Sequence, residues 1–291
     1  MLGITDMFLP HIRERQGQAL TGSDGFQGWA RVEASVGDLD GKDYSVGYHQ
    51  RSGLAQVGIG FAKPTASTDM LMVGATFGVA RGDWTPRLRS ARADMDVEST
   101  AFGLYVSWFE QADQSGGWYV DFVAQMSSFD FELDVPEARI ADYDGHGIGA
   151  SIEVGYITHA GAWRIEPKAR FTYLLSHVDG FTGADGLEAQ TNENERYRGR
   201  AAVRISTDTP LGGSVLTPTV TLGVAHDFKA DRGVFAGFDL LDANSPKTVA
   251  EGGAGLNLRI GKNILLFTEA EGRIASEYWE TAVRGGVTIR W

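Results

Sequence analysis

The chain ends in AVRGGVTIRW, residues Ala282–Trp291, and the alternation in this stretch decides the fold. Because successive side chains of a strand point to opposite sides, one face of the stretch is apolar and the other carries arginine near both ends. The apolar face consists of Val283, Gly285, Val287, Ile289 and Trp291. Such a strand fits a wall with lipid on one side and water on the other, although an ordinary amphipathic edge strand has the same pattern.

The composition excludes several classes of protein. The 291 residues contain no cysteine, which excludes disulfides and thiolate metal sites. The 38 glycines against 8 prolines favour many strands separated by turns. A formal charge of −12 argues against nucleic acid as a partner, because that affinity comes mainly from neutralising phosphates. Mean hydropathy is −0.17, and no apolar run approaches the ~20 residues of a spanning helix.

From Phe26 onward, alternation with a period of two predicts about twelve strands. The pattern is clearest in two consecutive strands near 163–173 and 196–205. Their apolar faces include Trp163, Ile165, Phe171, Val203 and Ile205. Their opposite faces carry Arg164, Glu166, Lys168, Arg170, Arg196, Arg198, Arg200 and Arg204. A soluble sandwich would not load its outer face so heavily with arginine.

The predicted connections sort into two sets. One set is short, with 63–69, 111–117, 159–162, 209–214 and 261–263. The other is longer and more polar, with 82–94, 134–144, 178–195 and 229–247, although 37–42 and 275–279 of this set are short. Short periplasmic turns and long outer loops are typical of transmembrane barrels. With the C-terminus taken as periplasmic, the longer set faces outward.

Residues 1–25 differ from the rest of the chain. The run Met7–Gln16 predicts one short helix in which Pro10 takes the first position and Gly17 ends the helix. The charges in residues 1–20 break any apolar run, so this stretch is not a signal peptide, and we expect a leader further upstream. We predict two parts, a short helix with a linker at 1–25 and a β-barrel at 26–291.

Several segments, in order, resemble the translocator domain of monomeric autotransporters, the barrel of type V secretion. GWYVD at 117–121 resembles a strand of this family, and YDGHGIGASIEVGY at 143–156 resembles its glycine-rich central strand. WRIEPKA at 163–169 resembles the following W-x-[IV]-E-P-x-A segment, and RAAVR at 200–204 matches a further strand in part. The resemblance covers nearly the whole chain.

The resemblance implies an all-β fold, a 12-stranded antiparallel transmembrane β-barrel with a short N-terminal helix in its pore. It implies a monomer in the outer membrane of a Gram-negative bacterium, surrounded by outer-membrane lipids and covalently linked to an upstream passenger that it carries to the cell surface. It also implies that the barrel-assembly machinery recognises Val287, Ile289 and Trp291. Some members cut their passenger free at an asparagine after the helix; the first asparagine here is Asn192, so we expect no such cut within residues 1–25.

We expect one set of charged residues to line the pore and contact the helix: Glu153, Arg164, Glu166, Lys168, Arg170, Arg200, Arg204, Glu269, Glu271 and Arg284. On the helix, Arg13, Glu14 and Arg15 are the expected partners, held by charge-assisted hydrogen bonds. The alternative for any one of these residues is simple pairing across neighbouring strands. Arg196 and Arg198 lie either in the pore or in the outer loop region.

Catalysis is not expected. None of the six histidines has metal-ligand spacing, so no metal or cofactor is predicted. Ser176 and His177 are neighbours on a strand, and their side chains therefore point to opposite faces. Two other functions stay open: a small 12-stranded porin that conducts solutes, and an adhesin acting through its outer loops, of which 229–247 is the most apolar.

Overall fold

The structure is a computed structural model of the chain. It describes residues 2–17, 24–40, 47–65, 68–87, 94–111, 113, 115–135, 138–182, 188–189, 192–230, 233–236, 239–242 and 246–291.

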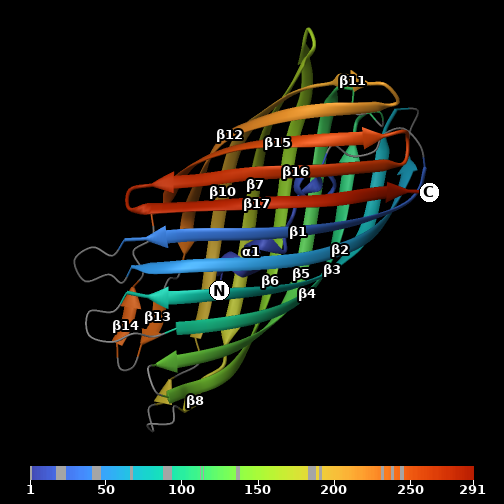
Figure 1. The fold of residues 1–291 in the computed structure, drawn as a ribbon. Coiled ribbons are helices and arrows are strands. Elements are labelled where there is room, and N and C mark those ends of the chain that lie inside the picture. Colours follow the sequence, from blue (N-terminus) through green and yellow to red (C-terminus); the bar gives the residue numbers. More distant parts are fainter. Residues whose placement is uncertain are drawn as a thin grey trace.

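Twelve long antiparallel strands form a closed barrel (Figure 1). They are β1 (Gly25–Leu39), β2 (Tyr48–Pro64), β3 (Met70–Pro86), β4 (Asp94–Phe109), β5 (Gly117–Val135), β6 (Ala138–Ala160), β7 (Trp163–Val178), β10 (Asn192–Thr207), β12 (Ser214–Ala230), β15 (Thr248–Ile260), β16 (Ile264–Ala275) and β17 (Tyr278–Arg290). Each strand pairs with its neighbours in the chain, and β17 pairs with β1 to close the wall. The predicted fold class is confirmed.

Five short strands lie outside this ring of twelve. β11 (Thr209–Leu211) pairs with the start of β12 in a turn. Two hairpins project at the opposite end of the barrel, β8 (Phe181–Thr182) with β9 (Glu188–Ala189), and β13 (Gly233–Ala236) with β14 (Asp239–Asp242). The connection predicted over 229–247 therefore contains a hairpin of its own.

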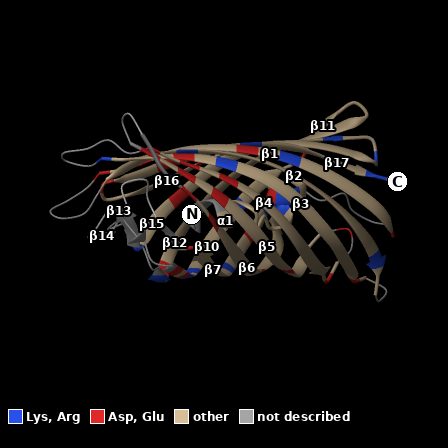
Figure 2. Ribbon diagram, turned by 90° about the horizontal axis from the view of Figure 1, so that it is seen from below, with Lys and Arg blue, Asp and Glu red and all other residues tan. Residues whose placement is uncertain are grey.

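The residues that alternate along each strand point in turn to the inner and to the outer side of the barrel wall. In β4, Tyr105 and Phe109 are buried inside the barrel, whereas Phe102 and Leu104 are exposed on its outer surface. β4 has no charged residue between Glu98 and Glu110, and β5 has none between Asp121 and Asp130. Figure 2 shows strands that are tan along most of their length, with charged positions at intervals. An outer surface of this kind suits a hydrocarbon environment.

The two sets of connections differ in length as a trend, and one predicted connection is corrected. β5 continues to Val135 and β6 begins at Ala138, so most of the connection predicted over 134–144 belongs to strands. We call the end of the barrel with the connections at 65–69, 110–116, 161–162, 208–213 and 261–263 the turn end. The opposite end, which we call the loop end, has long connections at 179–191 and 231–247, intermediate ones at 40–47 and 87–93, and two short ones at 136–137 and 276–277.

Two short helices replace the single one predicted over 7–16. α1 spans Leu2–Met7 and α2 spans Ile12–Gln16. Pro10 lies between them and not at the first helical position, because His11 is the N-cap of α2. The helix does end at Gly17, whose φ of 60° favours glycine. Neither helix is long or apolar enough to cross a membrane.

Residues 2–17, which we call the pore segment, lie inside the barrel. Phe8, Leu9 and Ile12 are fully buried against apolar side chains of the inner wall. Most of these wall residues come from β2 to β5, among them Leu54, Met72, Val97, Tyr105, Phe129 and Phe131, and Trp29 of β1, Ile157 of β6 and Leu174 of β7 join them. The inner wall is thus mostly apolar along β2–β5, with Asp121 of β5 as an exception, and most of the charged residues that contact the pore segment lie on β6, β7, β10 and β17.

Candidate functional site

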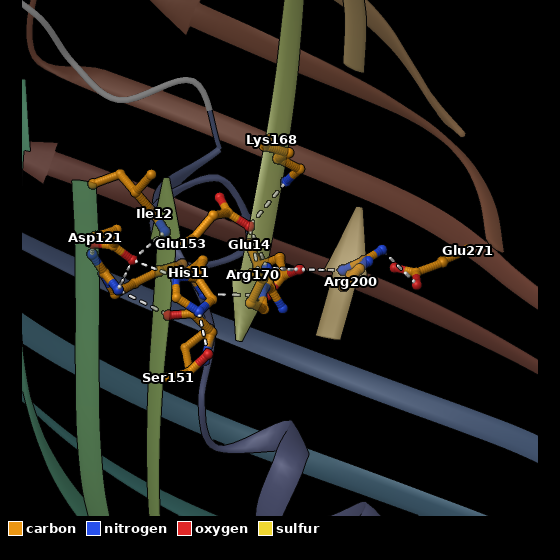
Figure 3. A network of polar contacts seen from close by, with 12 residues as sticks. His11, Ile12, Glu14, Asp121, Ser151, Glu153, Lys168, Arg170, Arg200 and Glu271 are labelled. Atoms are coloured by element: carbon orange, nitrogen blue, oxygen red, sulfur yellow. Dashed lines mark hydrogen bonds and ion pairs between the residues drawn. The ribbon is translucent and has the colours of Figure 1, made fainter. Parts of the chain in front are cut away.

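The charged residues of α2 meet charged residues of the wall inside the barrel. Figure 3 shows Glu14 facing Arg170 and Arg200, with His11 close to Asp121 and Ser151. The strands position these groups by simple alternation, since every second residue of β5, β6, β7, β10 and β17 points inward.

Glu14 is the meeting point of three strands. Its Oε1 lies 2.7 Å from Arg170 Nη2 of β7, 3.2 Å from Arg200 Nη1 of β10 and 3.7 Å from Arg284 Nη1 of β17. Burial would raise the pKa of Glu14, but these three arginines outweigh it and hold that pKa well below the usual range. Glu14 is therefore an ionised carboxylate that ties the pore segment to three strands of the wall, β7, β10 and β17.

The arginines around Glu14 also bind glutamates of the wall. Arg170 lies 2.9 Å from Glu153, and Lys168 lies 3.5 Å from the same carboxylate. Arg200 and Arg284 share Glu271, at 3.1 and 2.6 Å. Alternating charges keep each buried ion close to an opposite charge, which lowers the cost of removing it from water.

Arg13 makes a two-pronged contact with Glu166 of β7. Its Nε donates to Oε1 at 3.1 Å, and its Nη2 lies 3.0 Å from Oε2. The hydroxyl of Tyr119 donates to the same carboxylate at 2.9 Å. Burial works against the charge, but Glu166 and Tyr119 raise the pKa of Arg13 above its ordinary value. This geometry is specific to arginine, whose fork matches a carboxylate.

Arg15 points to the opposite wall and is completely buried there. Its Nη2 donates to Asp121 Oδ1 at 2.8 Å and to Ser107 Oγ at 3.0 Å. Its guanidinium carbon lies 3.9 Å from the ring centroid of Tyr105, which makes a cation–π contact. Arg15 thus fixes α2 to β4 and β5, while Glu14 fixes it to the far side.

His11 completes the contact with β5 and β6. Its Nδ1 lies 2.9 Å from Asp121 Oδ2 and its Nε2 lies 2.7 Å from Ser151 Oγ. Since an ionised carboxylate only accepts, Nδ1 carries a proton and donates to Asp121. Burial lowers the pKa of His11, and Arg170 lowers it further, while Glu153 and Asp121 oppose this. The ring is therefore neutral near pH 7, and Nε2 accepts from the Ser151 hydroxyl.

Ser151, His11 and Asp121 are hydrogen-bonded in the same order as the serine, histidine and aspartate of a hydrolytic triad. Their surroundings, however, indicate that they hold the pore segment in place. The Ser151 hydroxyl also lies 2.9 Å from Thr172 Oγ1 and 3.2 Å from the Phe171 carbonyl oxygen. Asp121 is shared with Arg15, which reduces its effect on the imidazole. All three side chains of the triad are at most 2% exposed, so a substrate has no approach to the serine while the pore segment is in place.

The structure brings seven of the predicted wall residues into the network around the pore segment. These residues are Glu153, Glu166, Lys168, Arg170, Arg200, Glu271 and Arg284. Three others face the lumen elsewhere. Arg164 lies 3.5 Å from Asp208, Arg204 is buried beside Glu166 in the register of β10 and β7, and Glu269 lies opposite Arg284 in the register of β16 and β17.

Arg196 and Arg198, left between two positions by the sequence, both lie on β10 and bind Asp227 inside the barrel. Arg198 also lies 3.3 Å from Asp6 of α1. The sequence interpretation missed His11, Asp121 and Ser151. The signal for Asp121 was available, because it is the only charged residue among the inward-facing positions of β5 from Tyr119 to Phe131.

The residues of the predicted assembly signal lie on the outer surface near the turn end. Ile289 and Trp291 are exposed, and Val287 is half-buried between Ala30 of β1 and Leu266 of β16. The indole of Trp291 stands over Gly28, where a Cβ would meet it at 3.2 Å.

The family model described as "Autotransporter beta-domain" matches residues 28–271. Autotransporter CRAC of Citrobacter rodentium is 27% identical over 201 residues, which are 67% of this chain and 12% of that protein. Pertactin autotransporter of Bordetella bronchiseptica is 24% identical over 205 residues, 68% of this chain and 22% of that protein. The chain thus spans less than a quarter of the length of these two relatives.

Solved structures share the fold. The transport unit of the autotransporter AIDA-I from Escherichia coli matches with a TM-score of 0.79 at 14% identity, over 98% of this chain and 93% of that chain. The β domain of the Bordetella autotransporter BrkA matches with a TM-score of 0.74 at 21% identity, over 91% and 99%. The family match over most of the chain agrees with the motifs and with the barrel, and this chain belongs to the autotransporter β-domain family.

Proposed function

We propose that this barrel is a translocator, which carries a polypeptide passenger joined ahead of residue 1 to the cell surface and keeps it anchored in the outer membrane of a Gram-negative bacterium. Its work is passage and anchoring, and no covalent bond is made or broken. The membership of the autotransporter β-domain family supports this role over that of a porin.

The course of the pore segment carries the proposal. Gln16 accepts a hydrogen bond from Gln27, close to the turn end where β1 begins. Asp6 contacts Arg198, six residues from the loop-end start of β10. The segment therefore runs backward along the pore from the turn end toward the loop end. A chain that continued ahead of residue 1 would leave at the loop end.

The turn end faces the periplasm and the loop end faces outward in this proposal, as in barrels with short inner turns and longer outer loops. Residues 1–25 then act as plug and linker, and residues 26–291 as the barrel. Glu14, Arg13 and Arg15, with their partners on the wall, hold the segment after passage. Without the segment the charged side of the lumen would be wetted, which suits the transit of an unfolded chain.

The test places a signal peptide and an epitope tag ahead of residue 1 of the full chain in a Gram-negative host. Protease is then added to intact cells. Removal of the tag, with the barrel protected, is the expected result. A tag that stays protected in correctly inserted barrels would contradict the proposal and favour the porin.

Assembly is tested with the same cells. In the proposal the barrel inserts as a monomer, and the assembly machinery reads the outward face of β17 at Val287, Ile289 and Trp291. Trp291→Ala should lower the amount of inserted barrel without changing the accessibility of the tag in the barrels that do insert. An unchanged amount would remove Trp291 from the signal.

A further inference from the structure

The outer surface of the barrel has a hollow at the seam where its first and last strands meet. A groove of about 570 Å³ extends from β17 across β1 and β2 to β3, and its lining is almost wholly apolar. The residues that line it include Ala30, Val32, Ala55, Phe77, Val79 and Gly285. It faces outward, since Val32 is 61% exposed and Phe77 is 51% exposed.

Small residues create the hollow. Val32 is paired with Gly285 on one side and with Ala55 on the other, so the neighbouring strands place no large side chain beside it. Local crowding does not require glycine at 285, where a Cβ would meet only the Phe267 carbonyl oxygen at an ordinary 3.5 Å. Gly53, two residues along β2 from Ala55, has open space in the same way, with its nearest neighbour at 4.0 Å. The backbone thus tolerates larger residues here, and their absence keeps the groove open.

Two arginines stand on the outer surface above the groove, toward the loop end. Arg81 is two residues beyond Val79 on β3, and Arg51 is four residues from Ala55 on β2, which are about 7 and 13 Å at ~3.3 Å per residue. Arg81 lies 3.6 Å from Glu98 and 3.9 Å from Asp83, and all three are more than half exposed. Arg51 Nε donates to His49 Nε2 at 3.3 Å. Long, exposed ion pairs are weak and can give way to a phosphate.

The opposite end of the groove has a more distant cation. Lys63 on the outer face of β2 is six residues beyond Val57, or about 20 Å. Half of a hydrocarbon core of ~30 Å is ~15 Å, which is about the depth that an acyl chain spans. A lipid whose acyl chain lies in the groove can therefore place its head group at Arg51 and Arg81, but not at Lys63.

We propose that the groove binds an acyl chain of a phosphate-bearing glycolipid of the outer leaflet, with its phosphate against Arg51 and Arg81. The apolar hollow takes the chain, and the two guanidinium groups select the head group. The inference rests on the membrane setting and the orientation given in the proposed function.

The experiment uses the full chain in phosphatidylcholine vesicles that contain a small share of diphosphoryl lipid A. After gentle extraction, native mass spectrometry measures the fraction of barrels that retain one lipid A. Ala55→Phe fills the groove, and Arg51→Gln with Arg81→Gln removes the head-group contacts. Ala169→Phe, at an exposed alanine of β7, and Lys63→Gln are the matched controls. Folding of each variant is checked by its heat-dependent gel mobility.

We expect retention to fall at least five-fold in the filled groove and in the double arginine variant, and to stay at the original level in both controls. Dephosphorylated lipid A should be retained by the unaltered chain as poorly as lipid A is by the arginine variant. Equal retention in folded groove variants and controls would overturn the inference. Cross-linked pairs of barrels that Ala55→Phe abolishes would assign the groove to a second copy instead.

The tag assay in intact cells separates the two proposals. Lost lipid retention in Ala55→Phe with an accessible tag supports both. Retention that no groove variant changes, with an accessible tag, contradicts only the lipid site. A protected tag contradicts the translocator, whatever lipid is retained.

Discussion

Glu14 joins three strands of the wall that are far apart in the chain. Its carboxylate is shared by Arg170, Arg200 and Arg284, and the last two also share Glu271. Removing the charge of Glu14 leaves these arginines with fewer opposite charges, although the wall glutamates stay in place. The loss of docking free energy should therefore be of the size expected for charge-assisted hydrogen bonds, and smaller than the cost of leaving a buried ion with no partner.

We predict that Glu14→Gln weakens docking of the pore segment by about 2 kcal/mol, which is roughly a thirty-fold rise in the undocked fraction. Single-channel conductance in planar bilayers measures this, because the docked segment lies inside the lumen and obstructs it. The control is Glu280→Gln, since Glu280 pairs with Arg273 and Tyr278 and its partners lie outside the contacts of Glu14. Equal conductance in both variants would show that Glu14 does not hold the segment.

The pore segment is divided between two kinds of wall. Phe8, Leu9 and Ile12 face the apolar wall of β2–β5, while Arg13 and Glu14 face the charged wall. His11 lies where the apolar and the charged parts of the wall meet, and four charged groups surround it. Asp121 of β5 and Glu153 of β6 favour its protonation, whereas Arg170 of β7 opposes it and Arg15 neutralises Asp121. Burial dominates, so the docked state holds a neutral ring.

This arrangement predicts that acid loosens the segment. The pKa of His11 is lower when docked than the ordinary 6.5, so the undocked segment binds more protons, and docking weakens as pH falls below 6.5. The pKa of Glu14 is also lowered by docking, so a second loss follows below its ordinary 4.5. Conductance should therefore rise between pH 7 and 5 and rise again in stronger acid.

His11→Gln is the matched variant for this prediction, because glutamine keeps a donor for Asp121 and does not titrate. Its conductance should be flat between pH 7 and 5 and should rise only in the range of Glu14. A variant that keeps the rise between pH 7 and 5 would assign that step to another group.

The sequence predicts the elements of this fold better than the contacts between them. All twelve long strands follow from period-two alternation, because each strand presents one face to the lumen and one outward. The helix bounds were wrong, since Pro10 takes the break between α1 and α2 and the N-cap is His11. The convergence on Glu14 was not predictable in detail. It joins residues more than 150 positions apart, and only closure of the barrel sets which strands face each other.

The structure of the whole barrel requires that one face of each strand point into the lumen and that the other point outward. Every second residue of the wall faces the lumen, and the residues between them form the apolar outer surface. Neighbouring residues on one strand therefore lie in opposite environments. On β10, Val203 is exposed on the outer surface, whereas Arg204 is buried in the lumen beside Glu166.

These two neighbours give the last prediction. Val203→Arg would place a charge in hydrocarbon and should cost about 2–4 kcal/mol of folding free energy in a bilayer if it lies near the midplane. Arg204→Ala should cost much less, because Glu166 keeps Arg13 and Tyr119 as partners. Urea titrations of the chain refolding into vesicles, followed by gel mobility, measure both. In detergent-free urea the two unfolded variants start from a similar state, so the difference reports on the folded barrel. Equal costs at 203 and 204 would mean that the two sides of the wall are not lipid and lumen, and the translocator would lose its physical basis.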